Sequence, residues 1–396
     1  MRQLNSIGDE EAGTLEVELL SDEVRALEVG LLSDEVHPSL QFQPRRPWCR
    51  GWAIFGVIVC TFSAVYLILL LGTSHSSTVC GARSLDPLCG ISAQKSQTVA
   101  PLNFLVVGDW GQDGLFNQTI VAEQMGIVGT KLNIDFVIST GDNFYEKGLT
   151  GPDDTQFTTS FSDVYTQESL QTPWYSVLGN RDYRGNVTAQ VAKELTIHDS
   201  RWFCSATYQF VCDLGFSDQG ERMDVEFFFV DTNPFVESYW MENNKDYIWQ
   251  LAISREDYIA HELKNLTSAL ETSNAKWKIV VGHHTMRCVG KHGETQELFA
   301  QMLPILEANG VDIYINGHDH CLQHIKRFDS PLHFLTSGGG SEAWRGRGNN
   351  ENKDGGLQFY YDGQGFAAVS MAPSLFHVDF YDISGNILHT VNLLKN

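Results

Sequence analysis

Short apolar runs separated by longer amphipathic stretches dominate the chain from about residue 100 onward. Buried strands are predicted at 102–107, 135–140, 174–178, 226–231, 277–282, 312–317 and 332–337. Helical periodicity is present at 116–130, 258–272 and 295–308. Strands that alternate with helices indicate an α/β architecture, and three further strand-like runs follow near the C-terminus. We therefore expect two sheets covered by helices.

Five of the apolar runs end at a glycine that is followed by side chains able to bind metal. These stretches are Gly108-Asp109-Trp110-Gly111, Gly141-Asp142-Asn143-Phe144-Tyr145, Gly179-Asn180-Arg181-Asp182, Gly282-His283-His284 and Gly317-His318-Asp319-His320. A single Gly-Asp or Gly-Asn is typical of a turn, and a single His pair is often structural. Because open α/β sheets place active sites in loops at the carboxyl ends of strands, we expect the five clusters to converge.

The donor types in these clusters restrict the metal. Aspartate, tyrosine, asparagine and histidine supply hard oxygen and borderline nitrogen ligands, which excludes an iron–sulfur cluster or a structural zinc site. Seven donors are too many for one ion with an open position. Two ions about 3.5–4 Å apart, bridged by one carboxylate, fit this number and are the arrangement used for in-line attack at phosphorus.

The succession GDWG, GDNFY, GNRD, VVGH and GHDH resembles the calcineurin-like metallophosphoesterases, and among them the purple, or tartrate-resistant, acid phosphatases, over roughly residues 100–395. The resemblance implies a β-sandwich of two mixed sheets flanked by helices. Many metallophosphoesterases have a histidine where this chain has Gly111, and Tyr145 looks like the phenolate ligand that favours ferric iron in the purple enzymes. The stretches at 226–235 and 337–346 also resemble small plant-like members.

The resemblance also implies roles for individual residues. Fe(III) would be held by Asp109, Tyr145 and His320, a divalent iron, zinc or manganese ion by Asn180, His283 and His318, and both ions by the bridging Asp142. His292 looks like the histidine that contacts phosphate in the family. An ordinary exposed loop histidine is the alternative for that residue.

Arg181 departs from the family pattern, which usually has GNHD or GNHE at this place. In relatives that histidine hydrogen-bonds phosphate and is associated with protonation of the leaving group. Arginine can clamp phosphate, but it is a poor general acid because its pKa lies above about 12. We expect an active enzyme that favours good leaving groups, with His292 or His284 supplying the remaining proton donation.

The motifs together predict hydrolysis of phosphomonoesters, either small molecules or phosphoproteins, with an acidic optimum. In such a centre Fe(III) would lower the pKa of a bound water, and the resulting hydroxide would attack while both ions neutralise the phosphate oxygens. Phosphodiesterase or nucleotide pyrophosphatase activity at the same dimetal site, and redox cycling of the iron, remain alternatives. A membrane glycoprotein whose site is weakened by Arg181 is the non-enzymatic alternative.

An apolar segment without charged residues at 51–72 is long enough to cross a bilayer as a helix. Arg45, Arg46 and Arg50 precede it and the next basic residue is Arg83, so the positive-inside rule places the N-terminus in the cytosol. We predict a single-pass type II membrane protein of the secretory or endolysosomal pathway. Its parts are an acidic cytosolic tail (1–50), the transmembrane anchor (51–72), a lumenal linker (73–99) and a lumenal or extracellular catalytic domain (100–396).

The acidic tail contains a near repeat, LEVELLSDEV at 15–24 and LEVGLLSDEV at 27–36. Its composition is typical of a partly disordered segment. The alternative is a sorting signal in which Leu19-Leu20 and Leu31-Leu32 contact adaptor proteins. The formal net charge of -22 argues against nucleic-acid binding, because a phosphate backbone would be repelled.

Three sequons and six cysteines lie beyond the apolar segment, as expected for a glycoprotein in an oxidising compartment. The sequons are Asn117, Asn186 and Asn265, and the cysteines are Cys80, Cys89, Cys204, Cys212, Cys288 and Cys321. The spacing of Cys80 with Cys89 and of Cys204 with Cys212 predicts short disulfide loops.

Overall fold

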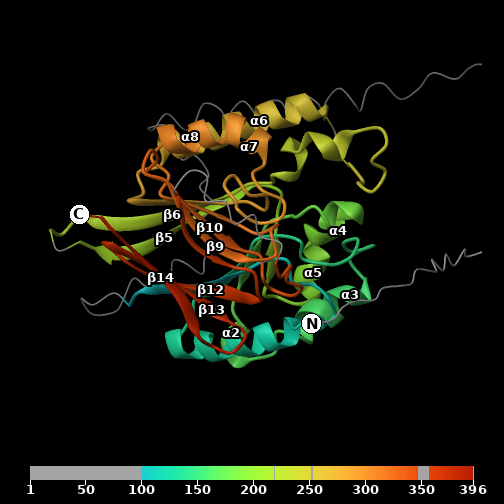
Figure 1. The fold of residues 1–396 in the computed structure, drawn as a ribbon, viewed down its shortest axis with the longest axis horizontal. Coiled ribbons are helices and arrows are strands. Elements are labelled where there is room, and N and C mark those ends of the chain that lie inside the picture. The colour runs from blue at the N-terminus through green and yellow to red at the C-terminus, as the bar shows by residue number, and fades with distance from the viewer. Residues whose placement is uncertain (1–99, 218, 251–252, 347–355, 396) are drawn as a thin grey trace, which may run out of the picture. The chain divides into compact units, whose positions relative to one another are not determined.

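Two seven-stranded sheets enclose a hydrophobic core in the computed structural model, which describes residues 100–217, 219–250, 253–346 and 356–395 (Figure 1). The first sheet consists, in spatial order, of β14 (Ile387–Leu394), β13 (Leu375–Asp382), β12 (Gly365–Ala372), β1 (Leu102–Val107), β2 (Phe136–Ser139), β3 (Trp174–Ser176) and β4 (Trp202–Cys204). The second consists of β11 (Leu357–Tyr361), β9 (Leu322–Lys326), β10 (His333–Ser337), β8 (Ile313–Asn316), β7 (Trp277–Val281), β6 (Arg222–Phe229) and β5 (Tyr208–Phe216).

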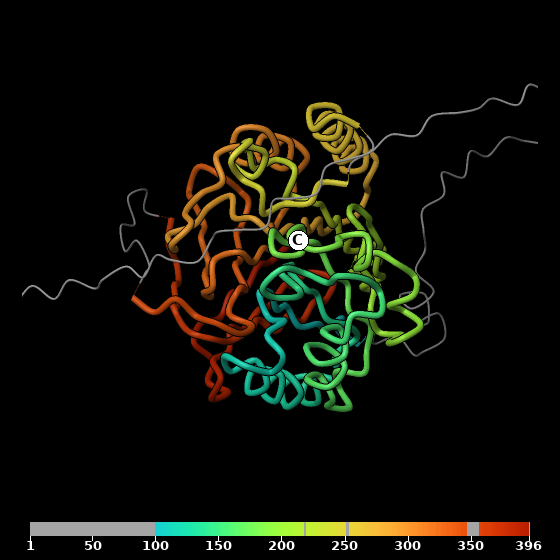
Figure 2. The backbone as a smooth tube through the Cα atoms, turned by 90° about the vertical axis from the view of Figure 1, so that its right-hand side faces the viewer, coloured from blue at the N-terminus to red at the C-terminus, as the bar shows by residue number. Residues whose placement is uncertain are grey.

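Both sheets are mixed, as predicted. Strands β1 to β4 run parallel, while β12 pairs antiparallel with β1 and continues into the β13–β14 meander. Strands β6, β7, β8 and β10 are parallel in the second sheet, and β5 and β9 are antiparallel to their neighbours. The last strands of the chain therefore lie beside β1, the first described strand (Figure 2).

The continuous apolar sequence of β1 is explained by burial on both faces. Phe104 and Val106 belong to the core between the sheets, where the Phe104 ring lies 5.4 Å from that of Phe227 in β6. Leu105 and Val107 alternate with them and belong to the cluster on the outer face of the first sheet. A strand that is covered on both sides loses the polar alternation of a half-exposed strand.

Helices cover the outer faces of the two sheets. The long helix α2 (Gln118–Leu132) packs on the first sheet, and α6 (Arg255–Thr272), α7 (Gln296–Gln301) and α8 (Leu303–Ala308) lie on the side of the second sheet (Figure 1). The shorter helices are α3 (Thr155–Phe157), α4 (Val187–Gln190) and α5 (Lys193–His198). The predicted helix at 295–308 is divided in two because Pro304 occupies the first turn of α8, where a missing N–H is tolerated.

Three histidines connect the sheets away from the strand-end loops. His324 in β9 contributes both of its ring nitrogens: Nδ1 lies 3.1 Å from Nε2 of His389 in β14, and Nε2 lies 3.0 Å from Nδ1 of His333 in β10. His324 is buried, and burial together with the neighbouring His333, His389 and Lys326 lowers its pKa to about 3. The contact therefore joins β14, at the edge of the first sheet, to β9 and β10 of the second sheet through uncharged imidazoles.

The cysteine prediction is wrong for the pair that the structure describes. Cys204 and Cys212 are not joined by a disulfide, because Cys204 in β4 packs in the outer cluster of the first sheet and Cys212 in β5 packs in the core between the sheets. Cys288 and Cys321 also form no disulfide. Cys80 and Cys89 lie outside the described residues.

The predicted tail, anchor and linker at 1–50, 51–72 and 73–99 also lie outside the described residues. Within the ranges that the structure does describe, none of the helices has both the length and the apolar character needed to span a bilayer. The predicted anchor and its orientation therefore stay predictions.

Candidate metal centre

The five strand-end clusters meet at one edge of the sandwich. Asp109, Asp142 and Asn180 follow β1, β2 and β3, which are adjacent parallel strands of the first sheet. His283 follows β7 and His318 follows β8, which are adjacent parallel strands of the second sheet. The carboxyl ends of neighbouring parallel strands lie together, so the chain order converges in space as predicted.

Tight turns aim these side chains inward. Asp109, Asp142 and His318 have positive φ angles of 60°, 50° and 71°, an uncommon conformation for residues other than glycine that is often found at functional sites. The loops also approach closely, since a Cβ on Gly179 would lie 2.1 Å from the backbone nitrogen of Asp142. A Cβ on Gly317 would lie 2.4 Å from Oδ2 of Asp109. Only glycine fits at these two positions.

A first set of donor atoms surrounds the hydroxyl of Tyr145. Its Oη lies 3.2 Å from Oδ1 of Asp109, 3.0 Å from Oδ2 of Asp142 and 3.1 Å from Nε2 of His320. All four side chains are buried. Two carboxylates, a phenol and an imidazole therefore point at one small volume.

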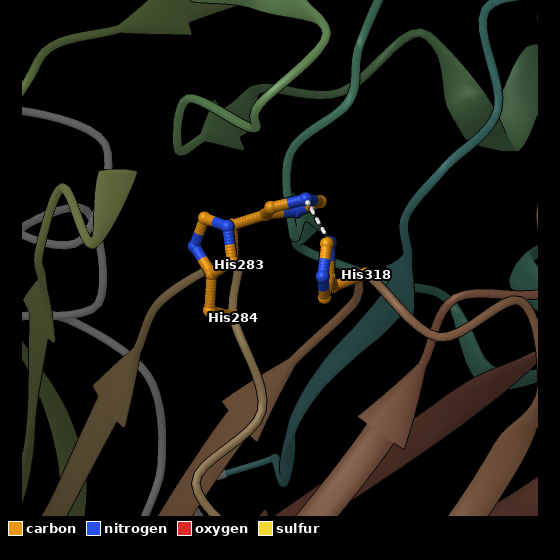
Figure 3. A group of neighbouring side chains, drawn as sticks. All are labelled: His283, His284 and His318. Carbon is orange, nitrogen blue, oxygen red and sulfur yellow. Dashed lines mark hydrogen bonds between the residues drawn. The ribbon is translucent and has the colours of Figure 1, made fainter. Parts of the chain in front are cut away.

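A second set of donor atoms gathers around the amide of Asn180. Its Oδ1 lies 3.2 Å from Nε2 of His283 and 3.1 Å from Nδ1 of His318, and these two ring nitrogens are 3.3 Å apart. Figure 3 shows His283 and His284 at the end of one strand facing His318 at the end of the next, with the contact between His283 and His318 dashed. One amide oxygen and two imidazoles form this set.

Asp142 stands between the two sets. Its Oδ2 faces Tyr145, whereas its Oδ1 lies 3.5 Å from Nε2 of His283 and accepts a hydrogen bond of 2.6 Å from the backbone N–H of Arg181. One carboxylate thus presents one oxygen to each set, which is the geometry that a bridging ligand requires.

The donors divide by sheet as well as by set. All the oxygen donors, from Asp109, Asp142, Tyr145 and Asn180, follow strands of the first sheet. All the nitrogen donors, from His283, His318 and His320, follow strands of the second. Each set of donors therefore combines ligands from both halves of the sandwich.

The electrostatics of the site favour bound cations. Burial and the neighbouring Asp142 raise the pKa of Asp109 well above its ordinary value, and burial together with both carboxylates raises the pKa of Tyr145. Burial lowers the pKa of His318 well below its usual range. Buried carboxylates are costly unless paired or bound to metal, while neutral imidazoles are ready ligands. The donor set therefore fits a pair of metal ions.

Asp182 holds the loops that carry the oxygen donors in place. Its carboxylate accepts hydrogen bonds from the backbone N–H groups of Asn143 and Gly179, at 3.1 and 2.7 Å, and from Nε2 of Gln190 at 2.7 Å. Burial and the charge of Asp142 raise the pKa of Asp182 to about 7. Asp182 thus positions the loops that carry Asp142 and Asn180.

Arg181 and His292 reach the same cleft from different sides. The cleft has a volume of about 450 Å³ and is lined by both residues, by His318 and by His320. The guanidinium of Arg181 lies 3.0 Å from Glu146 and stands over the ring of Tyr145. His292 is solvent-exposed, yet its ring stacks 4.3 Å from that of His318.

A ring nitrogen of His284 lies within 4.8 Å of ligand nitrogens of His283 and His318, but both nitrogens of His284 have other partners. Nδ1 lies 2.8 Å from Oγ1 of Thr232, and Nε2 lies 3.0 Å from Oη of Tyr239. Its ring packs 4.5 Å from that of His318. His284 is therefore a neighbour of the second donor set rather than part of it.

Two aromatic residues of the cleft were not singled out by the sequence. Trp344 stacks on His320 with ring centroids 3.8 Å apart and planes at 9°, and Tyr239 bonds to His284. Neither follows a predicted strand, so no periodicity marks them. Only the resemblance of the stretch around Trp344 to small plant-like enzymes gave a signal.

Comparisons with known proteins agree with this geometry. Residues 102–322 match the family described as calcineurin-like phosphoesterase. The chain is 49% identical over 326 residues to Purple acid phosphatase 3 of Arabidopsis thaliana, with 82% of this chain and 84% of the relative covered. This chain is a purple acid phosphatase. It is also 30% identical over 309 residues to tartrate-resistant acid phosphatase type 5 of Homo sapiens, with 74% and 90% covered.

Solved structures show that the fold is shared more widely. GAP50, the anchor in the inner membrane complex of Plasmodium, superposes with a TM-score of 0.63 at 24% identity and covers 75% of this purple acid phosphatase and 90% of its own chain. At this identity the likeness shows the fold alone. The family assignment makes the protein a metallophosphatase, an enzyme that hydrolyses phosphate esters at a dimetal site.

Proposed function

We propose that this purple acid phosphatase hydrolyses phosphomonoesters at acidic pH with a mixed Fe(III)–M(II) centre, in which M is iron, zinc or manganese. The position of Asp142 carries the proposal. One carboxylate lies between a donor set that contains a phenol and a donor set of an amide and two imidazoles, with one oxygen toward each. Two unlike sets joined by one carboxylate suit two unlike ions.

The donor chemistry supports the assignment of the two ions. Asp109, Tyr145 and His320 offer two anionic oxygens and one nitrogen when the phenol is ionised, a hard set that suits Fe(III). Asn180, His283 and His318 add no charge and suit a divalent ion. When bound, the ions activate water at acidic pH and neutralise charge on the phosphate oxygens.

The chain's own groups orient the ester. Arg181 stands at the mouth of the cleft with its guanidinium on the exposed Glu146, which a phosphate oxygen can replace. Such a charge-assisted hydrogen bond contributes roughly 1.5–3 kcal/mol. His292, stacked over His318 on the other side, offers a second contact to phosphate. These two residues hold the ester in line while the buried loops around Asp182 stay fixed.

Membrane attachment and processing are the second part of the proposal. The apolar segment 51–72 would anchor the protein as a type II membrane protein, with the catalytic domain lumenal or extracellular. Asn117 and Asn265 are exposed and Asn186 is partly exposed, which supports glycosylation at all three sequons. The dileucines of the tail would contact sorting adaptors.

Metal analysis and turnover test the catalytic proposal directly. The purified full-length protein should contain about two metal ions per chain, one of them ferric, and show a visible charge-transfer band. Turnover of p-nitrophenyl phosphate should peak at acidic pH and exceed that of bis(p-nitrophenyl) phosphate. A preference for the diester would favour the phosphodiesterase alternative, and two bound metals without turnover would favour a site weakened by Arg181.

A further inference from the structure

A chain of hydroxyl and imidazole groups leads from the interior to the substrate cleft. Oγ1 of Thr232 lies 2.8 Å from Nδ1 of His284, and Nε2 of His284 lies 3.0 Å from Oη of Tyr239. Thr232 and His284 are buried, whereas Tyr239 is partly exposed and lines the cleft. Because the His284 ring packs against His283 and His318, at 4.9 and 4.5 Å, the middle of this hydrogen-bonded chain lies beside the metal centre.

The hydrogen bonds of Thr232 determine which nitrogen of His284 carries the proton. Oγ1 of Thr232 accepts from the backbone N–H groups of His283 and His284, at 3.3 and 3.1 Å. A hydroxyl oxygen has two lone pairs and one hydrogen. With both pairs engaged, its hydrogen is donated to Nδ1 of His284. His284 therefore carries its proton on Nε2 and donates it to Tyr239, whose own hydrogen is left for another partner.

Packing fixes Tyr239 on the wall of the cleft. Its ring stacks on that of Tyr247 with centroids 4.3 Å apart and planes at 19°. Arg184 stands over the other ring of this pair, with its guanidinium carbon 5.4 Å from the centroid of Tyr247. The segment is also tied down by a backbone bond of 2.7 Å from Ile248 to Tyr183. Tyr239 is thus preorganised beside Tyr247.

The cleft needs a proton donor that Arg181 does not provide. The guanidinium of Arg181 is always protonated and is paired with Glu146. The Nε2 proton of His284 is already donated to Tyr239. Burial, with Tyr247 and Asp142 adding to it, raises the pKa of Tyr239 well above its ordinary value, so its hydroxyl keeps its proton at acidic and neutral pH. A leaving alkoxide is a stronger base than a phenolate, so a phenol can protonate it.

We propose that Tyr239 donates the proton that the leaving-group oxygen takes up, an inference that rests on the proposed phosphomonoesterase function. When the bond between phosphorus and that oxygen breaks, the electron pair stays on the oxygen, which accepts the proton from Oη of Tyr239 and departs as a neutral alcohol. A water oxygen bonds to phosphorus as the ester bond breaks, and the proton that this water releases to solvent balances the proton that the phenolate, held by the Nε2–H of His284, regains from solvent at the open side of the cleft. One water is consumed, and one phosphate and one alcohol are formed.

A leaving-group series with Tyr239→Phe tests the proposal. Wild-type, Tyr239→Phe and Tyr247→Phe full-length enzymes with equal metal content are compared on p-nitrophenyl phosphate, phenyl phosphate and glycerol 2-phosphate. Tyr239→Phe should lower kcat on glycerol 2-phosphate by about 10²-fold, the lower range for loss of a positioned acid, and change p-nitrophenyl phosphate turnover by less than about threefold. Tyr247→Phe keeps the ring that stacks on Tyr239 and removes only its hydroxyl, so it should show no such dependence.

Two results would overturn the assignment. An equal loss on all three esters in Tyr239→Phe would show that the tyrosine only supports His284. A dependence on the leaving group that occurs in Tyr247→Phe instead would move the donor to Tyr247. A wild-type enzyme with two bound metals and no turnover of p-nitrophenyl phosphate would refute the proposed function itself, which is a separate outcome.

Discussion

The contact among His324, His333 and His389 predicts that the folded protein loses stability in acid. Replacing His324 should make this loss smaller. Because the pKa of His324 is about 3 in the folded protein and about 6.5 in the unfolded chain, the unfolded chain binds the proton more readily. The free energy of unfolding therefore falls as the pH drops through 6.5, and the loss continues until the pH reaches the folded value. Replacing His324 with a side chain that does not titrate should remove this contribution.

The size of the effect at pH 5 depends mainly on the unfolded pKa. The lost free energy is RT ln(1 + 10^1.5), about 2 kcal/mol, and shifting the folded pKa upward by one unit changes it by less than about 0.1 kcal/mol. His324 is only 5% exposed, so solvent screening is small. The pKa values of His333 and His389 are also lowered in the folded protein, so these residues add to the acid-dependent loss. The contribution of His324 alone is about 2 kcal/mol.

Urea denaturation followed by tryptophan fluorescence at pH 7.5 and 5 measures the difference. His324→Gln keeps a polar side chain, and its loss of unfolding free energy between the two pH values should be about 2 kcal/mol smaller than that of the wild type. His261→Gln, at an exposed position of α6, is the matched control and should keep the wild-type dependence. If His324→Gln and the wild type lose the same unfolding free energy on acidification, the pKa of His324 is not lowered by folding and the reasoning fails.

Four further outcomes are expected. Tyr145→Phe removes the phenolate, so the visible band should vanish, and a persistent colour would disprove the Fe–Tyr145 assignment. Asp142→Ala removes the carboxylate between both donor sets, so metal analysis should show loss of the binuclear centre and turnover should fall by at least about 10²-fold; near-normal turnover would exclude bridging. Arg181→His should raise turnover of alkyl phosphates more than of p-nitrophenyl phosphate, and equal effects on both would mean that position 181 has no part in leaving-group protonation. Glycosidase treatment should shift the electrophoretic mobility of the full-length protein, and residue 265 should be protected from protease in sealed vesicles. An unchanged mobility together with protease access to residue 265 from the cytosolic side would contradict the type II topology.

The sequence predicted the metal-centre residues better than the wall of the cleft. Asp109, Asp142 and Asn180 each follow a short apolar strand, and adjacent parallel strands bring their ends together, so spacing along the chain carried spatial information. Tyr239 lies in a short 3-10 helix (Glu237–Trp240) and Trp344 in an irregular segment, and both are positioned by stacking, which leaves no periodic signal.

The helix prediction failed because it overlooked a proline, and the disulfide prediction failed because spacing along the chain does not show which sheet a strand joins. The apolar pattern at 295–308 is helical throughout, but Pro304 divides it into α7 and α8. The short spacing of Cys204 and Cys212 suits a disulfide loop, but the chain passes from one sheet to the other between them. A count of intervening residues cannot show such a crossing.

The division of donors between the sheets means that the two donor sets become complete only late in synthesis of the domain. Translation delivers the oxygen ligands first, because the last of them is Asn180, and the imidazoles follow only at His283, His318 and His320. Strands β12 to β14, which return to the first sheet, are the final part of the domain to be made. A nascent chain therefore lacks part of both donor sets until His318 and His320 have been made. Ions bound at both donor sets would therefore join the two sheets only after these histidines are in place, and β12 to β14 are added to the first sheet later still.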